Sequence, residues 1–246
     1  HAALQSLGLD GHYEVLDLPE RDVADALASL RDGRYHGLNV TVPFKQFVVD
    51  DTITLVGPAA LLGTVNTLVP LPNGTIEGHN TDVKGMQLAL LSQADTARFR
   101  GIHVSLYGAG GAARAALLAL DELGVARIDV YNRSIEHGQQ MVAELRPVIG
   151  AELHTPEGLE HPVDLVVQAT SIGSGWSTSA SAWGEAVSDA REDLKVLMPR
   201  LGVFDLVYRP APTPWTEAAE SLELAAIDGR EMLVRQAALS FELWTK

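Results

Sequence analysis

The stretch "SLYGAGGAARAALLAL", residues 105–120, constrains the fold more than any other part of the sequence. An apolar strand ends at Tyr107, a glycine-rich turn follows, and an alanine-rich helix begins at about Ala112. Such a turn presents backbone N–H groups at a helix N-terminus, where they can bind the pyrophosphate of a dinucleotide. A tight turn without a ligand is the alternative, but strand, turn and helix coincide here and favour a nucleotide site.

From Gly101 onward, short apolar strands alternate with amphipathic stretches of helix length. The predicted strands are residues 102–107, 128–131, 163–169 and 203–207. Alternation of this kind predicts right-handed crossovers and a parallel sheet. Residues 169–184, rich in serine and glycine, follow a strand and are expected to form a mobile loop.

The first part of the chain, from His1 to about Gly85, reads as a smaller α/β unit with a mixed sheet. Its predicted elements are an extended segment 12–18, a helix 21–33, a strand 38–42, and a strand pair 64–70 and 74–80. Residues 229–244 predict a final helix whose buried stripe carries one polar amide, Gln236, among Met232, Leu233, Leu239, Ser240 and Leu243.

Composition excludes several classes of protein. The chain has 246 residues, 46% of them hydrophobic, which suits two domains. Neither a membrane-spanning stretch nor a charged-then-apolar leader is visible, so we expect no membrane partner. The absence of cysteine suits a reducing cytoplasm. A formal net charge of −14 argues against a nucleic-acid partner, and scattered histidines give no support for a metal site.

The end of the strand at 128–131 indicates which dinucleotide is bound. An NAD site usually has Asp or Glu at this point, whereas this sequence has Asn132 followed by Arg133. An arginine can form two charge-assisted hydrogen bonds to a 2′-phosphate, which favours NADP(H). A solvated arginine after a strand is the alternative.

Two charged residues in the first part of the chain are candidates for acid–base chemistry. Lys45 follows the predicted strand at 38–42, and Asp82 precedes a predicted helix. Beside a nicotinamide, such a pair could exchange a proton with a substrate hydroxyl while hydride moves to the cofactor. The alternatives are a surface lysine and an aspartate that caps the helix.

Seven short motifs resemble the shikimate dehydrogenases, NADP-dependent enzymes of aromatic biosynthesis, in order and spacing. They are "NVTVPFK", "GTVNTL", "GHNTDVKG", "GAGGAAR", "NRS", "DLVYRPAPTP" and "GREMLVRQAALSFELW". The resemblance spans nearly the whole chain. It implies reversible NADPH-dependent reduction of 3-dehydroshikimate to shikimate. It also implies a substrate domain of residues 1–84 and 229–246, and a Rossmann-like NADP-binding domain of residues 85–228.

The resemblance also implies roles for individual residues. Lys45 and Asp82 would be the catalytic pair, and the substrate ring would be bound by Thr41, Asn66, Tyr208 and Gln236. The cofactor would be lined by Gly108, Ala109, Gly110, Gly111, Ala112, Asn132, Arg133, Ser134, Thr170, Leu206 and Gly229. A core amide bonded to the backbone is the alternative role of Gln236.

The sequence departs from the family pattern at three places. The family's first strand and its Ser-x-Ser-Pro turn, which binds the substrate carboxylate, would lie before His1, so we expect the chain to lack them. His137 stands where many members have a basic residue, and Gln168 stands where most have asparagine. The other possible functions are a quinate/shikimate dehydrogenase of relaxed specificity and a non-catalytic dinucleotide-binding module. The sequence does not decide the oligomeric state, for which a homodimer is one possibility.

Overall fold

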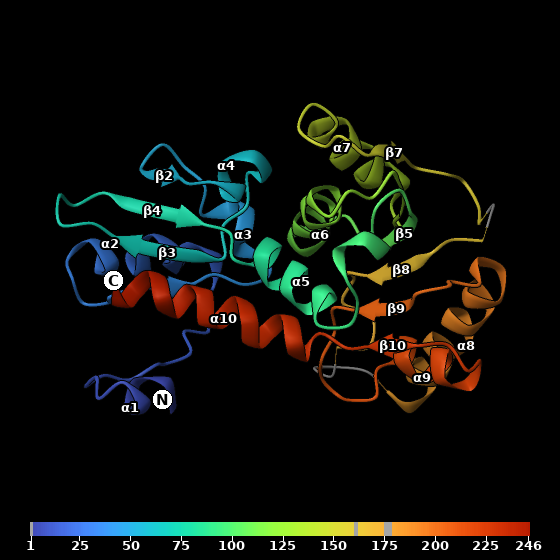
Figure 1. Ribbon diagram of the computed structural model, residues 1–246. Coiled ribbons are helices and arrows are strands. Elements are labelled where there is room, and N and C mark those ends of the chain that lie inside the picture. Colours follow the sequence, from blue (N-terminus) through green and yellow to red (C-terminus); the bar gives the residue numbers. More distant parts are fainter. Residues whose placement is uncertain (1, 160–161, 175–178) are drawn as a thin grey trace.

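The computed structural model describes residues 2–159, 162–174 and 179–246, which form two β-sheets joined by long helices (Figure 1). Sheet A is built from the first part of the chain and sheet B from the rest. Within the described ranges, no helix is both long and apolar enough to cross a membrane.

Sheet B is entirely parallel and confirms the predicted Rossmann-like α/β fold. Its strands, in spatial order, are β10 (Ala226–Ile227), β9 (Gly202–Asp205), β8 (Leu165–Gln168), β5 (His103–Tyr107), β6 (Arg127–Tyr131) and β7 (Glu152–His154). Since all six strands run the same way, their carboxyl ends meet at one edge, where ligands of open α/β sheets bind.

Helices cover both faces of sheet B. One face packs against α6 (Gly111–Glu122) and α7 (Ile135–Leu145), in a core that includes Leu106 and Val130. The other face packs against α8 (Ala180–Leu197) and α9 (Pro214–Ser221), around Val166 and Val203. A parallel sheet needs this double cover because both of its faces are apolar in the middle.

Sheet A is mixed, as the sequence predicted, and has its own core. Its strands lie in the order β1 (Leu38–Asn39), β3 (Thr67–Pro70), β4 (Ile76–His79) and β2 (Ile53–Leu55). The predicted hairpin is confirmed, since β3 and β4 pair antiparallel. Its surrounding helices are η1 (Glu20–Asp22), α2 (Val23–Arg31), α3 (Phe44–Phe47) and α4 (Pro58–Leu62).

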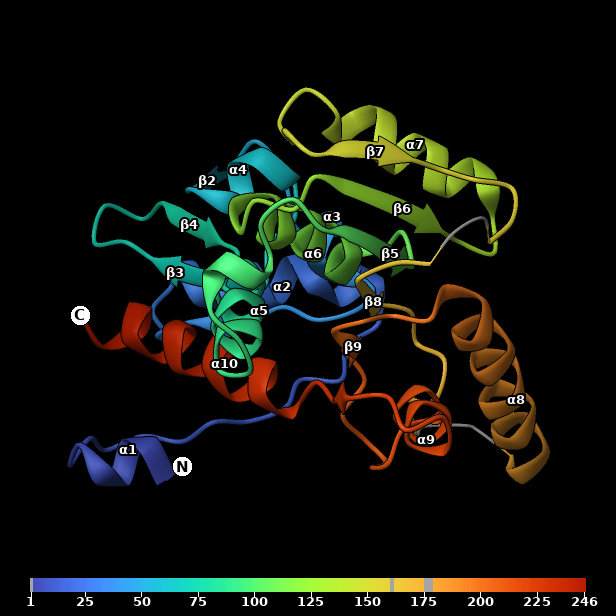
Figure 2. The same ribbon diagram turned by 45° about the vertical axis from the view of Figure 1, so that its right-hand side comes forward.

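Two helices connect the sheets. α5 (Asp82–Leu91) leaves sheet A and packs against α6, and η2 (Thr96–Arg98) then leads into β5. α10 (Arg230–Thr245) runs back from sheet B along α5 to β3, as both views show (Figures 1 and 2). The last helix of the chain therefore packs beside a strand of sheet A, which is built from the first part of the chain. The short α1 (Ala2–Ser6) lies apart from the rest and buries no residue (Figure 2).

The segment 12–18 is neither helix nor strand, which leaves its prediction as an extended segment standing. One expectation for the first part of the chain is wrong. The strand expected over 38–42 ends at Asn39, and Val42 is 75% exposed. β3 offers ladder partners to Leu38 and Asn39 only, so the alternation of apolar residues beyond them has no strand to pair with.

Further along the chain, several boundaries differ from the expectations. α6 begins at Gly111, one residue earlier than expected, and β7 and β10 were not predicted. Residues 169–184 do not all form a loop, since Ser179 caps α8 and the helix starts at Ala180. Residues 175–178 of that stretch lie outside the described residues. The last helix is confirmed, although Leu233 from its expected buried stripe is exposed.

Candidate active site

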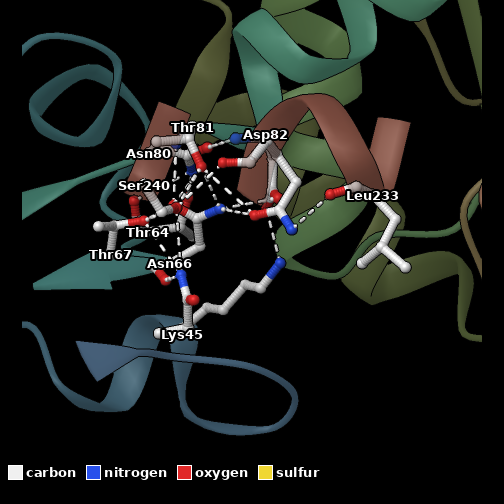
Figure 3. Close-up of polar contacts among 11 residues, drawn as sticks. Lys45, Thr64, Asn66, Thr67, Asn80, Thr81, Asp82, Leu233 and Ser240 are labelled. Carbon is white, nitrogen blue, oxygen red and sulfur yellow. Dashed lines mark hydrogen bonds and ion pairs between the residues drawn. The ribbon is translucent and has the colours of Figure 1, made fainter. Parts of the chain in front are cut away.

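Lys45 and Asp82 form a direct ion pair between α3 and the start of α5 (Figure 3). The Nζ of Lys45 lies 2.6 Å from Oδ2 of Asp82, and the two side chains are 15% and 6% exposed. Asp82 does not cap its helix through its side chain, so the capping alternative is wrong. The two charges are therefore paired with each other and largely shielded from water.

Local backbone contacts hold the pair in place. The carbonyl of Lys45 accepts a hydrogen bond of 2.7 Å from the N–H of Val65, which ties α3 to the segment before β3. On the other side, the N–H of Asp82 donates to Oδ1 of Asn80, and Asn80 in turn donates to Thr64. Both charged residues are thus anchored to the same end of sheet A.

Asn66 lies at the centre of a buried polar network. Its Nδ2 is 2.9 Å from Oδ1 of Asp82, 2.9 Å from Oγ1 of Thr81 and 3.1 Å from Oε1 of Gln236. Its Oδ1 accepts the backbone N–H of Thr81 at 2.8 Å. An amide has two N–H groups, so Nδ2 cannot serve all three acceptors at once. The hydroxyl of Thr81 also lies 3.4 Å from Oε1 of Gln236 and can donate to it, so the network can satisfy the third acceptor itself.

Gln236 reaches this network because α10 and α5 pack very closely. A Cβ on Gly85 of α5 would lie 2.8 Å from the Cβ of Gln236, so only glycine permits this approach. The core-amide alternative for Gln236 accounts only for its Nε2, which donates to the carbonyl of Leu233 at 3.0 Å. Its Oε1 accepts a hydrogen bond of 3.1 Å from Nδ2 of Asn66.

Four network members were not predicted as site residues. The Oγ atoms of Thr67 and Ser240 lie 2.7 Å apart, and Asn39 donates to Ser240 at 3.2 Å. Thr81 also contacts Ser240, at 3.2 Å. Thr67 and Thr81 adjoin predicted site residues in sequence, and Ser240 lies one helical turn after Gln236, which was the available signal.

Two predicted substrate residues are not part of this network. Thr41 and Tyr208 are exposed, Tyr208 by 43%, and neither side chain forms a hydrogen bond within the described ranges. The structure therefore brings together Lys45, Asp82 and the two amides, and leaves the remaining pair on the surface.

The glycine turn has the shape that a pyrophosphate requires. Gly108 has a φ of 118°, which favours glycine, and a Cβ there would lie 2.9 Å from the carbonyl oxygen of Ala169. Gly110 precedes α6, and no side chain caps the helix, so its first N–H groups are left for a ligand. Space beside Gly110 is open and Ala109 lies in the same turn, so these residues fit a dinucleotide.

This turn lies directly against Lys45. A Cβ on Gly111 would be 3.3 Å from Cδ of Lys45, so the start of α6 contacts the Lys45 stem. Ala112 follows within the first turn of the same helix. The predicted cofactor site and the predicted catalytic pair are therefore adjacent.

The residues after β6 form the next part of the predicted cofactor site. Nδ2 of Asn132 donates to the carbonyl of Ser134 at 2.8 Å, and Ser134 caps α7 by accepting the N–H of His137. Arg133 between them is exposed and has no ion-pair partner in the described part of the chain. Its guanidinium is thus free to bind a phosphate, which fits the 2′-phosphate of NADP(H).

The remaining predicted cofactor residues lie near the carboxyl ends of β8 and β9. Thr170 follows β8, and its N–H donates to Oε1 of Gln168, which is fully buried. The N–H of Leu206 donates to the carbonyl of Gln168 at 2.8 Å, and that of Gly229 donates to the carbonyl of Val207 at 3.0 Å. The side chain of Gln168 therefore bonds to the backbone of the segment that follows β8.

Asp205 is a buried carboxylate at the end of β9 that the sequence did not single out. Its Oδ1 accepts the N–H of Val207 at 2.9 Å, while Oδ2 is buried without a hydrogen bond of good geometry. Burial raises the pKa of Asp205 to about 7, and the charge of Asp228 adds to the rise. The hydroxyl of Thr213 and the N–H of Val207 oppose it only in part.

Comparisons with known proteins agree with this arrangement. Residues 1–68 match the model of the shikimate dehydrogenase substrate binding domain, and residues 229–246 match that of the shikimate 5′-dehydrogenase C-terminal domain. Shikimate dehydrogenase (NADP(+)) of Methylobacterium radiotolerans is 38% identical over 245 residues, which cover 96% of this chain and 82% of that enzyme.

Solved structures give the same result. Shikimate 5-dehydrogenase of Thermus thermophilus in complex with NADP(H) and shikimate is 31% identical, with a TM-score of 0.76 over 99% of this chain and 85% of that one. The ligand-free 5-ketofructose reductase of a Gluconobacter strain is 29% identical, with a TM-score of 0.78 and the same coverage. The identity to curated relatives over nearly the full length shows that the chain belongs to the shikimate dehydrogenase family.

Proposed function

We propose that the Lys45–Asp82 pair catalyses the reversible, NADPH-dependent reduction of 3-dehydroshikimate to shikimate. The observation that carries this proposal is the contact between the Lys45 stem and Gly111, because it sets a proton donor beside the turn that fits the cofactor. The assignment of the reaction and of NADP(H) is supported by membership of the family. The ion pair contains the proposed acid–base group.

The chemistry divides simply between cofactor and protein. When bound, NADPH supplies hydride to the substrate carbonyl carbon. The ammonium of Lys45 donates a proton to the carbonyl oxygen, which becomes the hydroxyl of the product. Asp82 holds Lys45 by the 2.6 Å ion pair and fixes the position of its Nζ. In the oxidative direction, neutral Lys45 takes the proton back.

The amides are suited to a substrate with several hydroxyls. Asn66 and Gln236 offer amide N–H groups and oxygens that can exchange their present partners for substrate hydroxyls. We assign this binding role to Asn66 and Gln236. Thr41 and Tyr208 are assigned to the rim of the same site, where their exposed hydroxyls can meet a ligand.

The proposed domains follow from these roles. Residues 1–84 and 229–246 would bind the substrate, since they supply sheet A and α10. Residues 85–228 would bind NADP(H) at the carboxyl edge of sheet B, through the glycine turn, the segment after β6, Thr170, Leu206 and the adjoining Gly229. We also propose a cytoplasmic location, which a chain without cysteine suits.

Steady-state NADPH consumption with 3-dehydroshikimate tests the proposed reaction. We expect turnover with this substrate, and NADP⁺ reduction with shikimate in the reverse direction. Quinate oxidation at a comparable rate would favour the enzyme of relaxed specificity, and faster reduction of 5-ketofructose would favour a reductase like the Gluconobacter neighbour. NADPH binding without turnover of any substrate would favour the non-catalytic module.

Arg133→Ala tests the cofactor assignment. Loss of hydrogen bonds to a charged phosphate should weaken NADPH binding by roughly 1.5–3 kcal/mol and change NADH binding little. Isothermal titration calorimetry with both cofactors measures this difference. Arg98→Ala, an exposed arginine before β5 at the opposite edge of sheet B, is the matched control. Equal losses for NADPH and NADH would show that Arg133 does not contact the 2′-phosphate.

A further inference from the structure

One charged side chain beside the proposed 2′-phosphate site has no role in the assignments above. Glu136 is exposed and lies in the first turn of α7, three residues after Arg133. Its Oε2 accepts a hydrogen bond of 3.0 Å from the hydroxyl of Ser134, itself a proposed cofactor residue. A carboxylate thus lies within the group of residues that would receive the ribose of the adenosine.

The carboxyl of Glu136 is ionised at neutral pH. Hydrogen bonds from its own backbone N–H and from the Ser134 hydroxyl hold its pKa below the ordinary value, and the nearby His137 acts in the same direction. The charged or titratable side chains of this segment are therefore Arg133, Glu136 and His137, with Glu136 the negative one.

The two cofactors differ where this carboxylate lies. NADPH carries a 2′-phosphate with nearly two negative charges, which a carboxylate repels. NADH carries a 2′-hydroxyl, which can donate a hydrogen bond to a carboxylate, as in sites that select NAD. Arg133 and Glu136 therefore act in opposite directions on the choice between the two cofactors.

We propose that Glu136 is a specificity-determining residue that narrows this chain's preference for NADPH over NADH. The inference rests on the proposed function, in which Arg133 and Ser134 bind the ribose end of the cofactor. Glu136 also has a structural role, since an acidic residue in the first turn stabilises a helix. That role alone would leave the ratio of the two affinities unchanged.

Calorimetric titration of the full chain with NADPH and with NADH, at low ionic strength, tests the proposal. In Glu136→Gln the ratio of the NADH to the NADPH dissociation constant should rise about three- to fivefold, within the size expected for exposed charges. Glu136→Lys should raise it further, because the effect follows charge. Glu152→Gln at the amino end of β7 makes the same charge change far from the site and should leave the ratio unchanged.

The outcomes distinguish a failure of the Glu136 inference from a failure of the proposed function. A ratio that stays within about twofold in both Glu136 variants, while NADPH still binds, overturns the inference and leaves the cofactor site standing. An equal rise in Glu152→Gln overturns it as well, because a general change of net charge would then explain the effect. If NADPH binds neither the natural chain nor the variants, the proposed function itself fails. Raising the salt concentration should shrink the difference, as screening of exposed charges requires.

Discussion

Lys45→Met is expected to lower kcat about 10²–10⁴-fold while KM stays within a few-fold. The reason is that Lys45 supplies a proton only as the carbonyl oxygen gains charge, so its removal affects the transition state more than substrate binding. Methionine keeps the length of the stem that packs against Gly111, so the cofactor turn should not be disturbed. Steady-state NADPH consumption with 3-dehydroshikimate measures both constants.

Lys84→Met is the matched control for this experiment. Lys84 lies two residues after Asp82 on the same helix, is exposed, and contacts Gln87 rather than Asp82. Its replacement should leave kcat unchanged. Since Lys45→Met leaves Asp82 buried without its cation, NADPH binding to the variant should be measured to show that the protein is folded. A large rise in KM with kcat preserved would make Lys45 a binding residue only.

The larger sheet could be predicted from sequence because its strands carry their own signal. Buried parallel strands are continuous apolar runs, and those ending at Tyr107 and Tyr131 are separated by a helix-length stretch. β7 and β10 escaped prediction because strands of two or three residues are too short to show a pattern. Residues 38–42 were predicted as a longer strand than the structure contains. Their apolar alternation extends to Val42, but only Leu38 and Asn39 have a neighbouring strand to pair with.

The site could be predicted only in part, because its residues come from distant segments. Lys45, Asp82 and Asn66 stand in motifs that resemble a family, and the structure places Lys45 and Asn66 each within hydrogen-bond distance of Asp82. Asn39 and Ser240 are ordinary polar residues 201 positions apart, and no local pattern indicates that α10 brings them together. The close packing at Gly85 that makes this possible is likewise visible only in three dimensions.

The buried carboxyl of Asp205 is expected to make the protein less stable as pH rises. Its pKa is about 7 in the folded protein and has its ordinary value of 3.8 in the unfolded chain. Between these values the folded state binds more protons, so its stability is fully present below about pH 3.8 and is lost as pH rises through about 7. The difference corresponds to about 4 kcal/mol of unfolding free energy.

Asp205→Asn isolates this contribution. Asparagine keeps the oxygen that accepts the N–H of Val207, so the turn leading to Leu206 and Tyr208 is preserved while the charge is removed. The unfolding free energy of the variant minus that of the natural chain should therefore increase as pH rises from 4 to 8, by up to about 4 kcal/mol. Urea denaturation at several pH values measures the two curves.

The difference between the two curves is the informative quantity, because asparagine brings an extra N–H group that can lower stability equally at every pH. Asp164→Asn is the control, since Asp164 is paired with Arg200 near the surface at the amino edge of the same sheet and should not reproduce the gain. Parallel curves for the natural chain and Asp205→Asn would show that ionisation of Asp205 does not lower the unfolding free energy. The hydroxyl of Thr213 would then have to compensate its charge more fully than the structure indicates.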